Sequence, residues 1–210
     1  MRARSYRFLQ SMMRRSKIRI EPGFFALLAA ACFLTRQESL LAVAAVICAH
    51  ELGHCAGLTL CGAEIQGIRL SWTGAVLEYD TARMSYPREI FVAFSGPAFS
   101  FLFAAALSCM GGRLGNEELY FAAGLSYILG LFNLVPVLPA DGGRILFFLL
   151  EWIGGWRLAA RVSRMIGIAV SCLLFALGLT LLWGYRRNWT LCILSIWMLI
   201  FSCKKRIDGV

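Results

Sequence analysis

Two histidines and a glutamate form a five-residue pattern, His50-Glu51-Leu52-Gly53-His54, within a long apolar run. If this run is helical, the histidines project from one face of the helix, where both imidazoles can bind one zinc ion. Glu51 lies one position further round, close enough to act as a general base on a water molecule at the metal. The chain contains no other histidine. The pattern therefore predicts a zinc-dependent hydrolytic site.

A third metal ligand is needed, because catalytic zinc usually takes three protein ligands and leaves one position for water. With both histidines used, the third ligand must be a carboxylate or a thiolate. We favour Asp141, which follows an apolar segment broken by prolines, since irregular backbone at membrane depth must be buried in protein or line a hydrated cavity. Cys48, Cys55 and Glu151 are the alternatives, and packing beside the histidines is the simpler interpretation of the two cysteines.

The composition is typical of an integral membrane protein. Of the 210 residues 59% are hydrophobic, and the mean hydropathy is +0.69, whereas apolar residues make up about half of a soluble domain even when glycine is counted. The net charge is +9, but lysine and arginine cluster at the ends of apolar runs rather than among aromatic residues. We therefore expect a lipid bilayer as a partner and no nucleic acid.

An all-α fold with six membrane-spanning helices is predicted, forming a single membrane-embedded domain over residues 1–210. A basic segment, 1–21, should lie on the cytoplasmic membrane surface, and the last two spans, within 158–203, are accessory. A short embedded helix is expected at 145–153. The predicted spans are 22–34, 38–60, 88–110, 119–135, 158–183 and 189–203.

One part of the chain has the pattern of strands. Residues 64–70 and 75–79 alternate between apolar and polar types around a Thr-Gly pair, which predicts a small membrane-associated β-hairpin. The cations are concentrated in the segments that six spans would place on the N-terminal side of the membrane. By the positive-inside rule, both termini are expected in the cytoplasm and the active site toward the cytoplasmic leaflet.

Two motifs together resemble those of the site-2 protease family of intramembrane zinc metalloproteases. The first is His50-Glu51-Leu52-Gly53-His54, and the second is the pattern Asn-x-x-Pro-x-x-x-x-Asp-Gly from Asn133 to Gly142. The span between them carries a Gly96-x-x-x-Ser100 element, which also allows close helix packing. Ser100 stands where many relatives have asparagine.

The resemblance implies a three-helix catalytic core over residues 38–142. It implies that His50, His54 and Asp141 bind one zinc ion per chain, that Glu51 is the catalytic base, and that Asn133 binds the substrate backbone. The resemblance is greatest to the bacterial stage IV sporulation protein FB group, whose context is sporulation. Members of that group often carry a CBS domain, which we do not expect here.

The resemblance also implies regulated intramembrane proteolysis of a membrane-associated regulatory protein, such as a transcription-factor precursor or an anti-sigma factor. An inhibitory membrane protein is a further expected partner. A membrane zinc carrier or channel is one alternative, although it would need more polar residues on other spans. An inactive scaffold that retains the protease fold is another, although every catalytic group is present.

Strand addition at the 64–80 hairpin would hold the substrate extended, and proline at Ile68 or Val76 should then impair cleavage.

Overall fold

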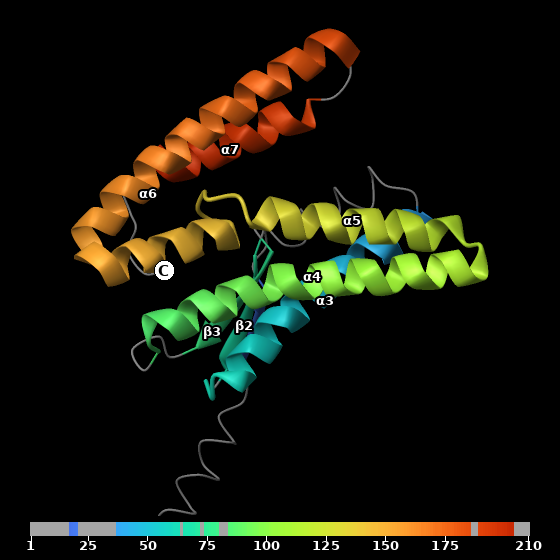
Figure 1. The fold of residues 1–210 in the computed structure, drawn as a ribbon, viewed down its shortest axis with the longest axis horizontal. Coiled ribbons are helices and arrows are strands. Elements are labelled where there is room, and N and C mark those ends of the chain that lie inside the picture. The colour runs from blue at the N-terminus through green and yellow to red at the C-terminus, as the bar shows by residue number, and fades with distance from the viewer. Residues whose placement is uncertain are drawn as a thin grey trace, which may run out of the picture.

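The computed structural model describes residues 17–20, 37–63, 65–71, 74–79, 84–185 and 189–203. Helices account for most of these residues (Figure 1). The predicted span 22–34 and most of the basic segment 1–21 lie outside the described residues. The helices are α3 (Gln37–Leu60), α4 (Tyr86–Leu114), α5 (Glu117–Asn133), α6 (Asp141–Tyr185) and α7 (Thr190–Cys203).

Helices α3, α4 and α5 pack against one another and form the centre of the molecule (Figure 1). A tight turn reverses the chain between α4 and α5, and Gly115 enters it with a φ of 62°, a conformation that favours glycine. The side chain of Asn116 then caps α5 by accepting hydrogen bonds from the N–H groups of Glu118 and Leu119. These local signals make α4 and α5 antiparallel neighbours.

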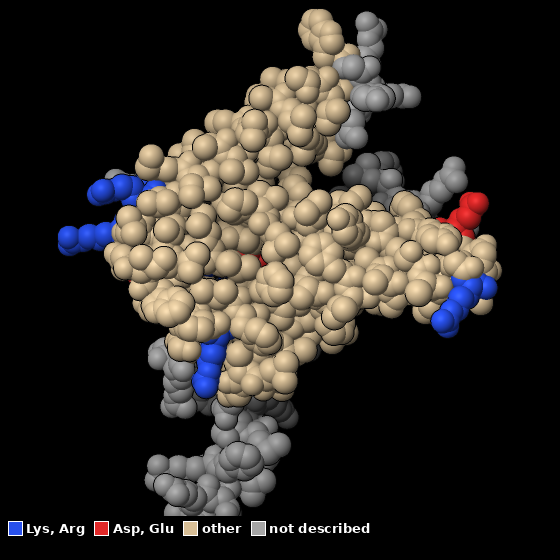
Figure 2. Space-filling view, viewed as in Figure 1, with Lys and Arg blue, Asp and Glu red and all other residues tan. Residues whose placement is uncertain are grey.

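Three of the described helices are long and apolar enough to cross a membrane, namely Leu40–Leu60, Tyr86–Leu114 and Asp141–Trp183. Figure 2 shows the same property, since Lys, Arg, Asp and Glu lie mainly near the edges of this face and other residues cover its middle. The chain is therefore a membrane protein. Helix α5, with 17 residues, and α7, with 14, are shorter, so the arrangement of six spans stays a prediction.

Helix α6 consists of two segments joined at Gly155, whose φ of 74° and ψ of 173° are not helical. Beyond Gly155 the chain folds back, and Phe147 of the first segment packs edge-on against Trp156 of the second, with ring centroids 5.2 Å apart. Phe147, Phe148 and Ala159 form a buried cluster at this bend. The second segment then pairs with α7 (Figure 1). The expected embedded helix at 145–153 and the span at 158–183 are these two segments.

A small sheet lies beside the helical core. Strands β2 (Ile65–Ser71) and β3 (Gly74–Tyr79) pair antiparallel, as the alternating pattern predicts. A third strand, β1 (Lys17–Ile20), pairs parallel with β2, so the sheet order is β1-β2-β3. The four residues of β1 belong to the segment expected to lie on the membrane surface. Strand β2 is thus central, and β3 is an edge strand of the sheet that the structure describes.

Candidate metal centre

Helix α3 places His50 and His54 on one face, one turn apart, as the four-residue spacing requires. Their side chains are buried, with 5% and 7% of their surface exposed, and their Nε2 atoms lie 3.3 Å apart. Close packing of α3 on α4 buries them. A Cβ atom at Gly53 would lie 2.6 Å from the carbonyl oxygen of Ser95, and a Cβ atom at Gly96 would overlap the His54 ring.

Asp141 reaches the histidines from the first turn of α6, at the end of the irregular segment that follows α5. Its Oδ2 atom lies 3.2 Å from the Nε2 atom of His50 and 3.2 Å from that of His54. Gly142 and Gly143 allow this approach, because any Cβ atom there would overlap the backbone of the preceding segment at Leu134 and Val137. The Asp-Gly-Gly sequence therefore lets the helix start directly against its own entry segment.

The three candidate ligand atoms form a nearly equilateral triangle with sides of 3.2, 3.2 and 3.3 Å. Zinc bonds to nitrogen and oxygen are about 2.0–2.2 Å long, so adjacent ligands of a tetrahedral ion lie about 3.3–3.6 Å apart. The triangle is therefore close to three corners of such a tetrahedron. Its fourth corner would remain for water or substrate, so this donor set could hold a metal ion.

Each imidazole also has a partner on its other nitrogen. The Nδ1 atom of His54 donates a hydrogen bond to the carbonyl oxygen of Val92, at 2.8 Å, because a carbonyl can only accept. The Nδ1 atom of His50 lies 2.9 Å from the hydroxyl oxygen of Ser100. When each neutral ring carries its proton on Nδ1, both Nε2 atoms present lone pairs to the metal position. Such outer partners fix the orientation of metal-binding histidines.

Ser100 and the Val92 carbonyl are the site groups that sequence reasoning missed. Packing alone explained the Gly96-x-x-x-Ser100 element, and nothing in a sequence marks a backbone carbonyl as a partner. The structure gives Ser100 a contact with His50, and the hydroxyl of Ser126 donates to the Ser100 carbonyl at 2.9 Å. Both serines are fully buried. A serine one turn after Gly96, on the helix facing the histidines, was the available signal.

Glu51 is half-buried and close enough to interact electrostatically with His50, His54 and Asp141. Among the described residues, the metal-binding group consists of the two histidines and Asp141, and it does not include Cys48, Cys55 or Glu151. Cys48 is exposed, and Cys55 is partly buried.

Asn133 is the last residue of α5, directly before the segment that leads to Asp141. Its Nδ2 atom donates a hydrogen bond to the carbonyl oxygen of Leu129, at 3.0 Å. The structure thus uses the amide of Asn133 within its own helix. Its role in substrate binding stays a prediction.

A buried His-His-Asp group with an adjacent glutamate is a donor set that a catalytic metal ion could use. The model of peptidase family M50 matches residues 113–177, which include Asp141. The chain is 31% identical over 135 residues to a zinc metalloprotease of Methanocaldococcus jannaschii, covering 62% of this chain and 39% of that protein. It is 30% identical over 146 residues to a putative zinc metalloprotease of Synechocystis, covering 67% of this chain and 38% of that protein.

The fold is similar to the solved structure of the site-2 protease from Methanocaldococcus jannaschii, with a TM-score of 0.67 and 24% identity over 92% of both chains. The chain therefore matches peptidase family M50 over residues 113–177 and has a fold similar to that of a site-2 protease. It spans about two-fifths of the length of the curated relatives that it matches.

Proposed function

We propose that the protein is an intramembrane zinc metalloprotease that hydrolyses a peptide bond in or near a transmembrane segment of a membrane-associated regulatory protein. The observation that carries this proposal is the triangle of His50 Nε2, His54 Nε2 and Asp141 Oδ2 beside the Glu51 carboxylate. Zinc is the metal that the names of the relatives give, and it suits two imidazoles and one carboxylate.

Zinc bound at this triangle would polarise the scissile carbonyl and make a water molecule a better nucleophile. Glu51 accepts a proton from the attacking water and delivers it to the nitrogen of the leaving amine. The C–N bond of the peptide breaks, and the water oxygen stays on the new carboxyl group. Ser100 and the Val92 carbonyl hold the two imidazoles in place throughout, so the site does not need to rearrange.

A substrate must reach this site in an extended form, because a helical peptide bond is shielded by its own hydrogen bonds. We propose that the edge strand β3 receives the substrate by strand addition, since β1 and β3 already flank the central strand β2. Asn133, at the entry to the segment before Asp141, is the proposed contact for the substrate backbone.

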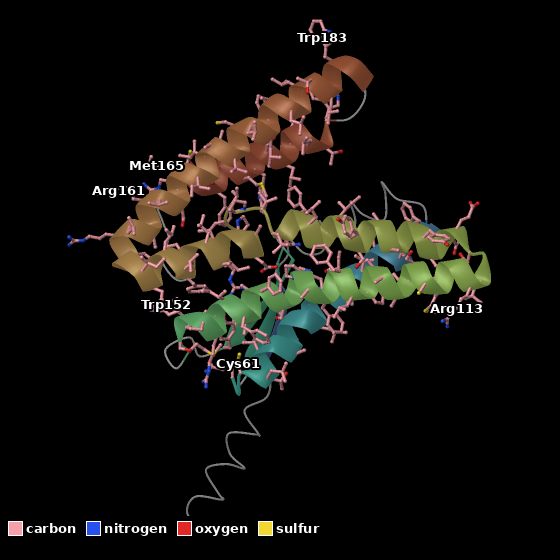
Figure 3. The ribbon with its side chains drawn as sticks, in the orientation of Figure 1. Cys61, Arg113, Trp152, Arg161, Met165 and Trp183 are labelled. Atoms are coloured by element: carbon pink, nitrogen blue, oxygen red, sulfur yellow. The ribbon has the colours of Figure 1, made fainter. Side chains whose placement is uncertain are left out.

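We further propose six membrane spans, with both termini and the active site toward the cytoplasm. Arg161 and Arg113 lie at opposite ends of the molecule in Figure 3, with an apolar middle between them, which fits helices that cross the bilayer along this direction. A transcription-factor precursor or an anti-sigma factor is the proposed kind of substrate, in sporulation or another regulated process. A second membrane protein is the proposed inhibitor.

The variant Glu51→Gln tests the function, because it keeps the shape of the side chain and removes the base. In cells that also express a membrane-linked candidate substrate, we expect shortening of the candidate with the parent protein and none with Glu51→Gln. Zinc content, measured on the purified variant, should equal that of the parent. If vesicles that contain the Glu51→Gln variant still transport zinc, that result would instead support a carrier. If the purified parent protein contains no zinc, that result would contradict the proposal.

A further inference from the structure

A chain of polar contacts leads from the candidate metal ligand Asp141 to a buried carboxylate on α4. The Nη1 atom of Arg144 lies 3.9 Å from Oδ1 of Asp141, and its Nη2 atom donates to the hydroxyl of Tyr79 at 2.9 Å. The Tyr79 hydroxyl in turn donates to Oε2 of Glu89 at 2.7 Å. Three elements contribute to the chain: α6 provides Asp141 and Arg144, β3 provides Tyr79, and α4 provides Glu89.

The two oxygens of Asp141 therefore have different surroundings. Oδ2 faces both histidine Nε2 atoms at 3.2 Å, whereas Oδ1 faces the guanidinium of Arg144. A carboxylate can turn about its Cβ–Cγ bond and can present one oxygen or both to a metal. A cation placed on the side of Oδ1 favours the orientation in which Oδ2 alone points to the histidines.

Arg144 can hold this position only if its own side chain is fixed, because a free arginine loses much rotamer freedom when it is immobilised. The Tyr79 hydroxyl accepts one hydrogen bond from Arg144 and donates another to Glu89, so both of its usual roles are filled. Burial raises the pKa of Tyr79 to about 12, with Glu89 adding to the effect, so the phenol keeps its proton at neutral pH.

Glu89 anchors the chain on α4, the helix that also supplies the histidine partners. Its side chain is only 3% exposed, and no hydrogen-bond partner of its Oε1 atom is found among the described residues. A buried carboxylate with so few partners is costly unless a nearby cation compensates it. Arg144, one hydroxyl away, is that cation, and it is shared between Glu89 and Asp141.

We propose that Arg144 is a positioning residue, held by Tyr79 and Glu89, that orients Asp141 so that one carboxylate oxygen points to the metal. This rests on the proposed function, because it assumes that Asp141 is a zinc ligand. It also connects β3, the proposed substrate-binding strand, to the metal centre through Tyr79, the last residue of that strand.

The test measures the zinc affinity of the purified full chain by competition with a chelator, so it does not depend on a known substrate. We expect Arg144→Met to weaken zinc binding by about 10- to 100-fold, the usual cost of losing a partner of a metal ligand. Arg144→Lys keeps the charge and should be intermediate. The control is Arg161→Met, which removes an exposed arginine of the same helix and should leave affinity unchanged.

Tyr79→Phe removes one hydroxyl and should weaken zinc binding by several-fold. If Tyr79 acts through Arg144, it should have no further effect in the Arg144→Met background. Independent, additive effects of the two substitutions would overturn the proposal, as would parent-like affinity in both Tyr79→Phe and Arg144→Met. In either case zinc binding by the parent and loss of cleavage in Glu51→Gln would still support the protease, whereas a parent that binds no zinc removes both proposals.

Discussion

The hydroxyl oxygen of Ser100 lies 2.9 Å from Nδ1 of His50, on the side of the ring opposite the metal position. Both residues are buried, and they come from different helices, α4 and α3. The serine hydroxyl can accept a hydrogen bond from His50 Nδ1 or donate one to it, so it holds the orientation of the ring in either tautomer. In that orientation the Nε2 atom faces Asp141 and His54.

Replacing Ser100 with alanine should therefore weaken zinc binding by about 10-fold or more. The fold should survive, because only one oxygen atom is lost. Ser171→Ala is the matched control, since Ser171 is equally buried but donates only to the carbonyl of Gly167 in its own helix. Chelator competition on both purified variants provides the measurement. Equal zinc affinity in the two variants would show that Ser100 only fills space.

Replacing Gly96 with alanine should weaken zinc binding more than the loss of the Ser100 hydroxyl does. A Cβ atom there would overlap Nε2 and Cε1 of the His54 ring, and the ring cannot move away without leaving the metal position. Overpacking of this kind costs about 1–3 kcal/mol, so Gly96→Ala should weaken zinc binding by about 10- to 100-fold.

The control for Gly96→Ala is Gly124→Ala on α5, where a new Cβ atom would meet nothing within 4 Å. This variant should bind zinc like the parent, and the better helix propensity of alanine should keep it at least as stable. If Gly96→Ala bound zinc normally, the contact between α3 and α4 would have to be looser than the structure has it.

The first metal-binding motif could be placed from sequence because its spacing alone puts two side chains on one helical face. The sequence made Asp141 the favoured third ligand but could not place it beside the motif. Asp141 is 87 positions after His54, and the irregular segment that precedes Asp141 has no periodic pattern. The hairpin followed from alternation, but β1 did not, because four residues with two cations, next to a strongly basic segment, look like a surface segment rather than a strand.

Contacts between elements were the part that the sequence could not provide. Arg144 looked like one more cation at a membrane surface, and Tyr79 and Glu89 looked like the ends of a strand and a helix. Only the packing of β3 and α6 against the start of α4 brings these three side chains together. Likewise, Gly96 and Ser100 of α4 indicated close helix packing but not which ring that packing would orient.

Tyr79 also gives the protein a specific response to alkaline pH. Its pKa is about 12 in the folded protein, against an ordinary value of 10, so the folded state holds the phenol proton more tightly than the unfolded state does. The stability from this group is complete below about pH 10 and is lost as the pH rises through about 12. Raising the pH from 9 to 12 should therefore lower the thermal unfolding temperature of the parent more steeply than that of Tyr79→Phe. Parallel curves for the two proteins would contradict this role of burial at Tyr79.

Proline substitutions test whether the edge strand β3 receives the substrate. Ile68 is a poor position for this test, because it lies in the central strand, between Ile18 of β1 and Leu77 of β3. Val76 and Leu77 are neighbours in β3, so one N–H points to β2 and the other points away from the sheet.

Val76→Pro and Leu77→Pro should therefore differ. At the position whose N–H points to β2, proline removes a hydrogen bond of the sheet and should lower stability. At the position whose N–H points away from the sheet, proline removes only a donor at the open edge. We expect the second variant to keep its stability and its zinc and to lose cleavage by at least about 10-fold, because an extended substrate would lack one backbone partner. Thermal unfolding identifies that variant, and zinc content and cleavage are then measured on it. Full cleavage by a stable, zinc-loaded proline variant would exclude substrate addition at this edge.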